Sequence, residues 1–181
     1  MGIFQHIRNL VGGRPQASDE QLATVLEGFD DYCQKLIGAV DASWDASTRM
    51  RSVEYCVFLY GAALAIVRGN GREDAYSVAM LGPYLSRFMD WQLSVRWLLE
   101  CEAEMAKSPR LQGVQAAGGN TAQAVLLAGS QGRSEDLNRP HNTQLLIQIF
   151  SEVRKLMADK TATDEPLFTT SGQLYDSVVG K

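Results

Sequence analysis

A stretch without any charged residue, 57–67, constrains the fold of this chain more than any other feature of its sequence. It belongs to an apolar segment, 53–67, that is interrupted by Glu54 and whose 15 residues fall short of the roughly 20 that a transmembrane helix needs. A helix that is apolar on nearly all sides is instead buried in a protein core. Gly61 and three neighbouring alanines leave little bulk on parts of its surface, so another helix can approach closely. The sequence thus predicts a central buried helix over about 46–68.

Apolar residues recur at helical spacing in three further segments, which predict helices over 18–40, 72–107 and 142–160. Ser18 and Gln21 form a capping box at the start of the first of these helices. The second segment is divided by Gly82-Pro83. Because proline lacks a backbone N–H, we expect a kink or a break there, with Pro83 opening the second part. That second part has an apolar surface too wide for a strict two-helix seam.

The turn at Gly69-Asn70-Gly71 would join the central helix and the next one as an antiparallel hairpin. At matching levels of this hairpin, Arg51 lies opposite Asp90 and Glu54 lies opposite Arg87. The pattern therefore predicts two ion pairs, each contributing about 0–1 kcal/mol.

Three segments are predicted to be less regular. Residues 1–16 form a short amphipathic arm that ends in glycines and a proline. Residues 108–140 hold seven Gly or Pro around one short helical stretch, 121–128, and are expected to be mobile. Residues 161–181 carry many large apolar groups, so we expect them to pack on the chain itself or on another molecule. The predicted fold is all-α, an up-and-down bundle of four to five helices over 17–160, with an amphipathic N-terminal arm and a partly ordered C-terminal tail.

The composition argues against several classes of function and of location. The 17 Lys and Arg against 21 Asp and Glu give a net charge of −4, and without a basic stripe we expect no binding to nucleic acid. Cys33, Cys56 and Cys101 lie far apart in apolar helical stretches, which is typical of buried free thiols in a reducing compartment. The N-terminus has no signal-peptide pattern. We therefore expect a cytoplasmic protein.

No known catalytic motif occurs in the sequence. A nucleophile elbow, a phosphate-binding loop and a dinucleotide fingerprint are all missing. The chain has two histidines, and neither follows a glutamate at the spacing of a ferritin-like metal centre. We therefore expect no enzyme, no catalytic residue, no metal site and no cofactor.

The leading hypothesis is a non-enzymatic protein-interaction module, such as an adaptor, an assembly factor or a chaperone, that self-associates, for example as a homodimer. Its candidate binding residues are apolar residues of the two ends and acidic residues of the first helix: Ile3, Phe4, Ile7, Leu10, Glu27, Asp30, Asp31, Phe168, Leu174 and Tyr175. The arm carries Arg8 and Arg14 without acids, which allows membrane contact. Because two cations are few for lipid binding, a protein partner is favoured.

Two alternatives remain open. The first is a helical binder of an apolar small molecule, with a pocket between the second and third helices lined by Tyr60, Leu64, Tyr84, Phe88 and Trp91. The second is an effector exported without a cleaved signal, for which the N-terminal arm would serve as the address.

Overall fold

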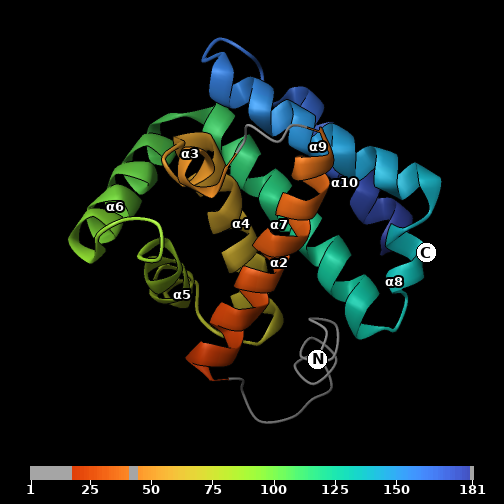
Figure 1. Ribbon diagram of the computed structural model, residues 1–181, viewed down its shortest axis with the longest axis horizontal. Coiled ribbons are helices and arrows are strands. Elements are labelled where there is room, and N and C mark those ends of the chain that lie inside the picture. Colours follow the sequence, from red (N-terminus) through yellow and green to blue (C-terminus); the bar gives the residue numbers. More distant parts are fainter. Residues whose placement is uncertain (1–17, 41–44, 180–181) are drawn as a thin grey trace.

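The computed structural model describes residues 18–40 and 45–179, and every regular element in these residues is a helix. This confirms the predicted all-α fold. The predicted arm, 1–16, lies outside the described residues. Figure 1 shows the arrangement of the described helices. In chain order these are α2 (Asp19–Val40), α3 (Ala46–Met50), α4 (Val53–Gly69), α5 (Ala75–Leu85), α6 (Trp91–Lys107), α7 (Pro109–Ser130), α8 (Ser134–Leu137), α9 (Pro140–Ala158) and α10 (Glu165–Val178).

Helices α4 and α7 cross at the centre of the molecule with their backbones in contact (Figure 1). A Cβ atom added to Gly118 of α7 would lie 1.9 Å from the carbonyl oxygen of Phe58, and one added to Gly61 of α4 would lie 1.9 Å from that of Gln115. Only glycine fits at such distances. The close approach predicted at Gly61 is therefore confirmed, and α7 is the helix that makes it.

Helix α7 occupies most of the region for which the sequence predicts irregular structure. It begins at Pro109, behind Ser108, whose Oγ accepts a hydrogen bond from the backbone nitrogen of Leu111 at 3.3 Å. The expectation of only a short helix over 121–128 was wrong. Glycine weakens a helix by roughly 1 kcal/mol relative to alanine. At Gly118 this cost is offset by the close packing that the missing side chain permits.

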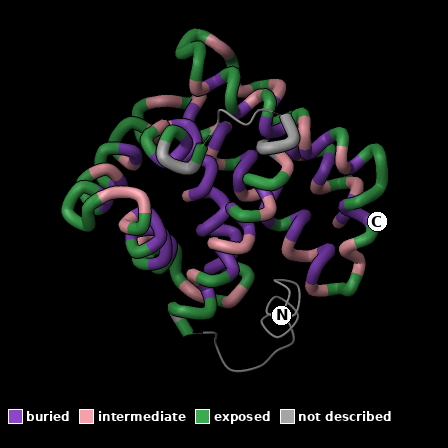
Figure 2. The backbone as a smooth tube through the Cα atoms, viewed as in Figure 1, coloured by how far each residue is buried: buried purple, intermediate pink, exposed green. Residues whose placement is uncertain are grey.

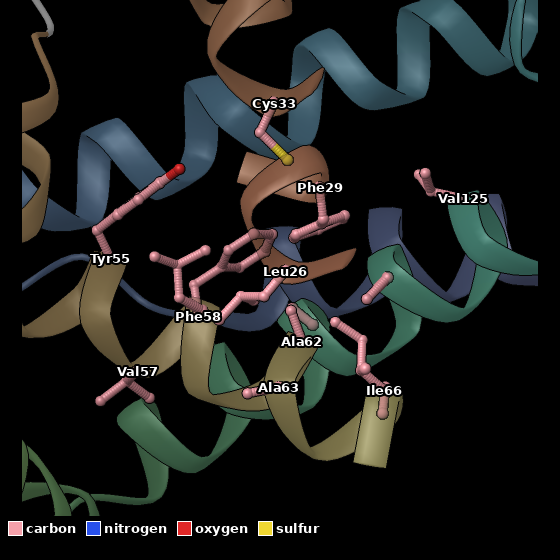
Figure 3. Close-up of a cluster of buried hydrophobic side chains, with 14 of the residues drawn as sticks. Leu26, Phe29, Cys33, Tyr55, Val57, Phe58, Ala62, Ala63, Ile66 and Val125 are labelled. Carbon is pink, nitrogen blue, oxygen red and sulfur yellow. The ribbon is translucent and has the colours of Figure 1, made fainter. Parts of the chain in front are cut away.

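The core gathers around Phe58 of α4 (Figure 3). The centroid of its ring lies 6.4 Å from that of Phe29 in α2, 6.2 Å from that of Tyr55 and 5.9 Å from that of Phe150 in α9. Such aromatic pairs contribute about 0.5–1.5 kcal/mol beyond the burial of their area. The apolar residues predicted to line the first helix are buried as far as Cys33: Leu22, Val25, Leu26, Phe29 and Cys33. Helix α2 therefore packs on the central helix through the predicted stripe.

The C-terminal tail forms α10, which packs on α7 and α9 of its own chain. Its apolar residues Leu167 and Leu174 are buried. Two polar contacts fix its position, since Asn120 Nδ2 donates to Ser171 Oγ at 3.4 Å and Ser177 Oγ donates to Asn142 Oδ1 at 2.8 Å. The tail was expected to pack either on its own chain or on another molecule, and the structure shows it packed on its own chain.

The break in the third predicted helix comes later than expected. Pro83 lies inside α5, which continues to Leu85 before the chain leaves the helical conformation. Helix α6 begins at Trp91, where the Asp90 carboxylate accepts a hydrogen bond from the backbone nitrogen of Gln92 at 2.9 Å. A proline removes one backbone hydrogen bond, but its own φ suits a helix. The cap at Asp90, and not Pro83, therefore sets the start of the second part.

Neither predicted ion pair of the hairpin is present among the described residues. Arg87 instead pairs with Glu27 of α2, and Asp90 serves as the cap of α6. Glu54 is buried, and its partners are Arg110 at the start of α7 and Lys160 just after the end of α9. The prediction was wrong because Arg51 lies before the start of α4, and Arg87 and Asp90 lie after the end of α5, so these three residues do not belong to the helices of the hairpin.

Glu54 joins three separate parts of the chain. Both of its carboxylate oxygens accept hydrogen bonds from Lys160 Nζ at 2.7 Å, and Oε1 accepts a further one from Arg110 Nη1 at 3.1 Å. Burial alone would raise the pKa of Glu54, but the hydrogen bonds from Lys160, its own backbone and Ser52 outweigh burial and lower it. Arg110 also donates to the carbonyl oxygen of Leu156 at 2.8 Å, which satisfies a free carbonyl at the end of α9.

The crossing of α4 and α7 is tested by Gly118→Ala. We expect the free energy of unfolding to fall by about 1–3 kcal/mol, because the new methyl group would overlap the Phe58 carbonyl and push the helices apart. Gly172→Ala in α10 is the matched control. No atom lies within 4 Å of a Cβ added there, so the same change should stabilise the protein by about 0.5–1 kcal/mol. Urea unfolding followed by circular dichroism measures both effects, and a Gly118→Ala variant as stable as the natural chain would contradict the described crossing.

Candidate functional site

Large apolar side chains are exposed mainly on one helix. Of the six that are exposed in the described part of the chain, four belong to α6. Trp91, Val95 and Leu99 are four residues apart and follow one side of α6, while Leu93 lies around the helix, near Arg96. These four residues together are called the α6 face below. Leu93 is 56% exposed and Leu99 is 59% exposed, the two highest values among the six. Helix α6 lies at the edge of the molecule beside α5 (Figure 1), and exposed residues follow its length (Figure 2).

Helix α6 is apolar on its inner side as well. Leu98 and Cys101 are buried against the core. The half-buried Trp97 donates a hydrogen bond from Nε1 to the backbone oxygen of Met50 at 3.1 Å, which ties α6 to α3. The inner side attaches the helix to the bundle, so the α6 face is an additional apolar surface. The wide apolar surface seen in the sequence was the signal for it.

A shallow hollow of about 440 Å³ adjoins the α6 face. Its lining combines apolar and charged side chains: Arg51, Met89, Leu93, Arg96, Trp97 and Glu100. Arg96 Nε and Glu100 Oε1, both in this lining, are 2.9 Å apart and form an ion pair across one helical turn. Protein–protein interfaces combine apolar and charged side chains in the same way.

A separate feature of the structure is a buried polar cluster around Asp30. Its carboxylate accepts hydrogen bonds from the hydroxyls of Tyr55 and of Tyr84, the latter at 2.5 Å, and lies 3.5 Å from Arg49 Nη2. The Arg49 guanidinium also lies over the Tyr55 ring, 5.3 Å from its centroid. The four residues come from α2, α3, α4 and α5, so the cluster fixes how these helices meet. Asp30 was predicted to lie on a docking surface, and this prediction was wrong because its side chain is 1% exposed.

The chemistry of this cluster favours positioning over reaction. Burial, and then the negative charge of Asp30, raise the pKa of Tyr55 and of Tyr84 well above the ordinary tyrosine value. Burial likewise raises the pKa of the Cys33 thiol nearby. All of these groups keep their protons at neutral pH, so the hydroxyls act as fixed donors to a carboxylate closed off from solvent.

The structure spreads the other predicted partner-binding residues over two helices. Asp31 is exposed on α2, and Glu27 is half-buried in its pair with Arg87. Phe168 is exposed on α10 and Tyr175 is half-buried. Leu174 is fully buried, so its assignment to a binding surface was wrong. The remaining candidates, Ile3, Phe4, Ile7 and Leu10, lie outside the described residues.

The five residues of the alternative ligand pocket lie in different surroundings. Tyr84 is bound to Asp30, and the Phe88 ring packs edge-on against the ring of Tyr84 at 5.5 Å between centroids. Trp91 is exposed on the α6 face, while Leu64 is buried in the core. Tyr60 lines a cavity of about 10 Å³ between α4 and α6, which has room for about one water molecule. The structure therefore does not gather these residues into one ligand-sized pocket.

Comparisons of the chain with protein-family models, with curated proteins and with solved structures find no match. Within residues 18–40 and 45–179, no helix combines the length and the apolar character needed to cross a bilayer. The same residues contain no group of three or more His, Cys, Asp or Glu side chains arranged to hold a metal ion.

Tyr84→Phe tests the Asp30 cluster through its response to alkaline pH. Tyrosine in an unfolded chain loses its proton near pH 10, whereas the pKa of Tyr84 in the folded protein lies well above that value. The stabilising effect of Tyr84 is therefore complete below pH 10 and decreases as the pH rises further. Between pH 8 and pH 11 we expect the natural chain to lose about 1 kcal/mol more stability than Tyr84→Phe. Urea unfolding at both pH values measures the difference, and equal losses would show that the site does not hold this proton.

Proposed function

We propose that this protein is a non-enzymatic protein-interaction module that self-associates through the α6 face. The observation that carries the proposal is the concentration of exposed apolar side chains on one helix, where four of the six such residues of the described chain lie. Exposed apolar side chains gathered on one element in this way mark interaction sites in water-soluble proteins. Trp91 adds a side chain of the type that dominates binding energy in interfaces.

The charges beside the α6 face favour a second copy of the chain as the partner. Arg96 and Glu100 are four residues apart and line the same hollow. If two α6 helices pair in antiparallel fashion about an axis near residue 98, Arg96 of each copy lies beside the partner's Glu100. A twofold interface needs such self-complementarity, because both subunits contribute the same patch.

The proposal places the protein among adaptors, assembly factors or chaperone-like proteins of a reducing compartment such as the cytoplasm. Cys33, Cys56 and Cys101 support this location, because all three are buried free thiols. Binding of an apolar small molecule receives less support, since the described structure does not gather the five residues expected to line its pocket.

Light scattering coupled to size exclusion tests the proposal on the full chain and on the double variant Leu93→Asp/Leu99→Asp. We expect the natural chain to show twice the mass of one chain. The double variant should self-associate at least about 100-fold more weakly, because burying a leucine contributes roughly 1.5–3 kcal/mol and each aspartate replaces that gain with a charge.

Phe168→Asp is the matched control, since it places the same charge on an exposed apolar position of α10, away from the α6 face. This variant should keep the mass of the natural chain. The proposal fails if the natural chain is a monomer at every concentration, or if Phe168→Asp dissociates it while the α6 variant does not.

A further inference from the structure

Two of the three thiols meet on the inner side of α6. Cys56 belongs to α4 and Cys101 to α6. Cys56 is fully buried and Cys101 is 4% exposed. Both line the cavity of about 10 Å³ between the two helices, and Met105 lines it as well.

The helical spacing brings these sulfur atoms to one place. Cys101 and Met105 are four residues apart on α6, so they lie on the same side of that helix, one turn from each other. Cys56 reaches the same cavity from the facing helix. Three sulfur-bearing side chains from two helices thus surround a space the size of a small ion.

We propose that Cys56 and Cys101, together with the thioether of Met105, bind one Cu(I) ion between α4 and α6. Thiolate and thioether sulfur are the soft ligands that Cu(I) prefers, and two or three of them suffice for this ion. A structural zinc site needs four ligands from Cys, His, Asp or Glu, and the described residues hold no group of even three in such an arrangement. Glu102 also lines the cavity, but among the described residues it does not form a metal-binding group of three with the two cysteines.

Binding requires no change of oxidation state. The two thiols lose their protons to solvent, and two sulfur–copper bonds form: 2 R–SH + Cu⁺ gives [RS–Cu–SR]⁻ and 2 H⁺. The site goes beyond the proposed function, because it lies on the side of α6 opposite to Leu99 and would fasten this helix to α4.

The test is a titration of the reduced full chain with Cu(I) in the absence of oxygen, with bicinchoninate as the competing chelator. We expect one ion per chain and a thiolate-to-copper charge-transfer absorption in the near ultraviolet. Cys56→Ser and Cys101→Ser should each weaken binding by at least about 100-fold, the upper range for losing even an outer partner of a metal site. Met105→Leu keeps the volume of the side chain and should weaken binding by about 10-fold.

Cys33→Ser is the matched control, because it removes an equally buried thiol from α2 next to the Asp30 cluster. It should leave the affinity unchanged. X-ray absorption spectroscopy of the copper-loaded natural chain gives a second readout that does not depend on how the variants fold, and should show sulfur ligands alone. The proposal is overturned if Cys56→Ser and Cys101→Ser bind Cu(I) as tightly as the natural chain, if Cys33→Ser weakens binding equally, or if the absorption spectrum shows no sulfur around copper.

Discussion

The backbone contact between α4 and α7 is the constraint on which the rest of this structure depends. Gly61 and Gly118 let two long helices approach more closely than side chains would allow, and the other helices are arranged around this pair. Helix α10 packs on the far side of α7, while α2, α5 and α6 contact α4. A wider spacing at the crossing would separate the two groups and leave the uncharged stretch of α4 partly exposed to water.

Two buried carboxylates orient the helices around this central pair. Two consecutive residues at the start of α4 contact the two clusters. Glu54 binds Lys160 and Arg110, and Tyr55 binds Asp30. Removing charges from water costs several kcal/mol, so a buried ion pair adds little net stability compared with an apolar packing of the same shape. We interpret both clusters as devices that select one arrangement of the helices, because each carboxylate is satisfied only when three or more segments meet correctly.

The sequence predicts the parts of the fold that follow from hydrophobic pattern. The uncharged stretch predicted α4, and the helical spacing of apolar residues predicted α2. The small residues near Gly61 predicted that another helix packs closely there. The sequence does not predict α7, because glycines usually interrupt a helix. Only the structure shows that Gly118 of α7 lies against the backbone of α4, where its missing side chain allows close packing. The burial of Asp30 was missed for a related reason, since its three donors come from positions 19, 25 and 54 residues away along the chain. The α6 face was visible as an apolar surface, but its exposure depends on where the other helices end.

Helix α6 differs from its neighbours because it has an apolar side that the bundle does not use. Helices α4 and α7 therefore form the centre of the structure, and α6 is the proposed binding element. Hydrogen exchange of the full chain at low and high protein concentration tests this division most directly. We expect α4 and α7 to exchange most slowly at both concentrations, and residues 91–107 to become protected only at the high concentration. Protection that rises in α10 instead of α6, or an α7 that exchanges as fast as the surface loops, would contradict the account.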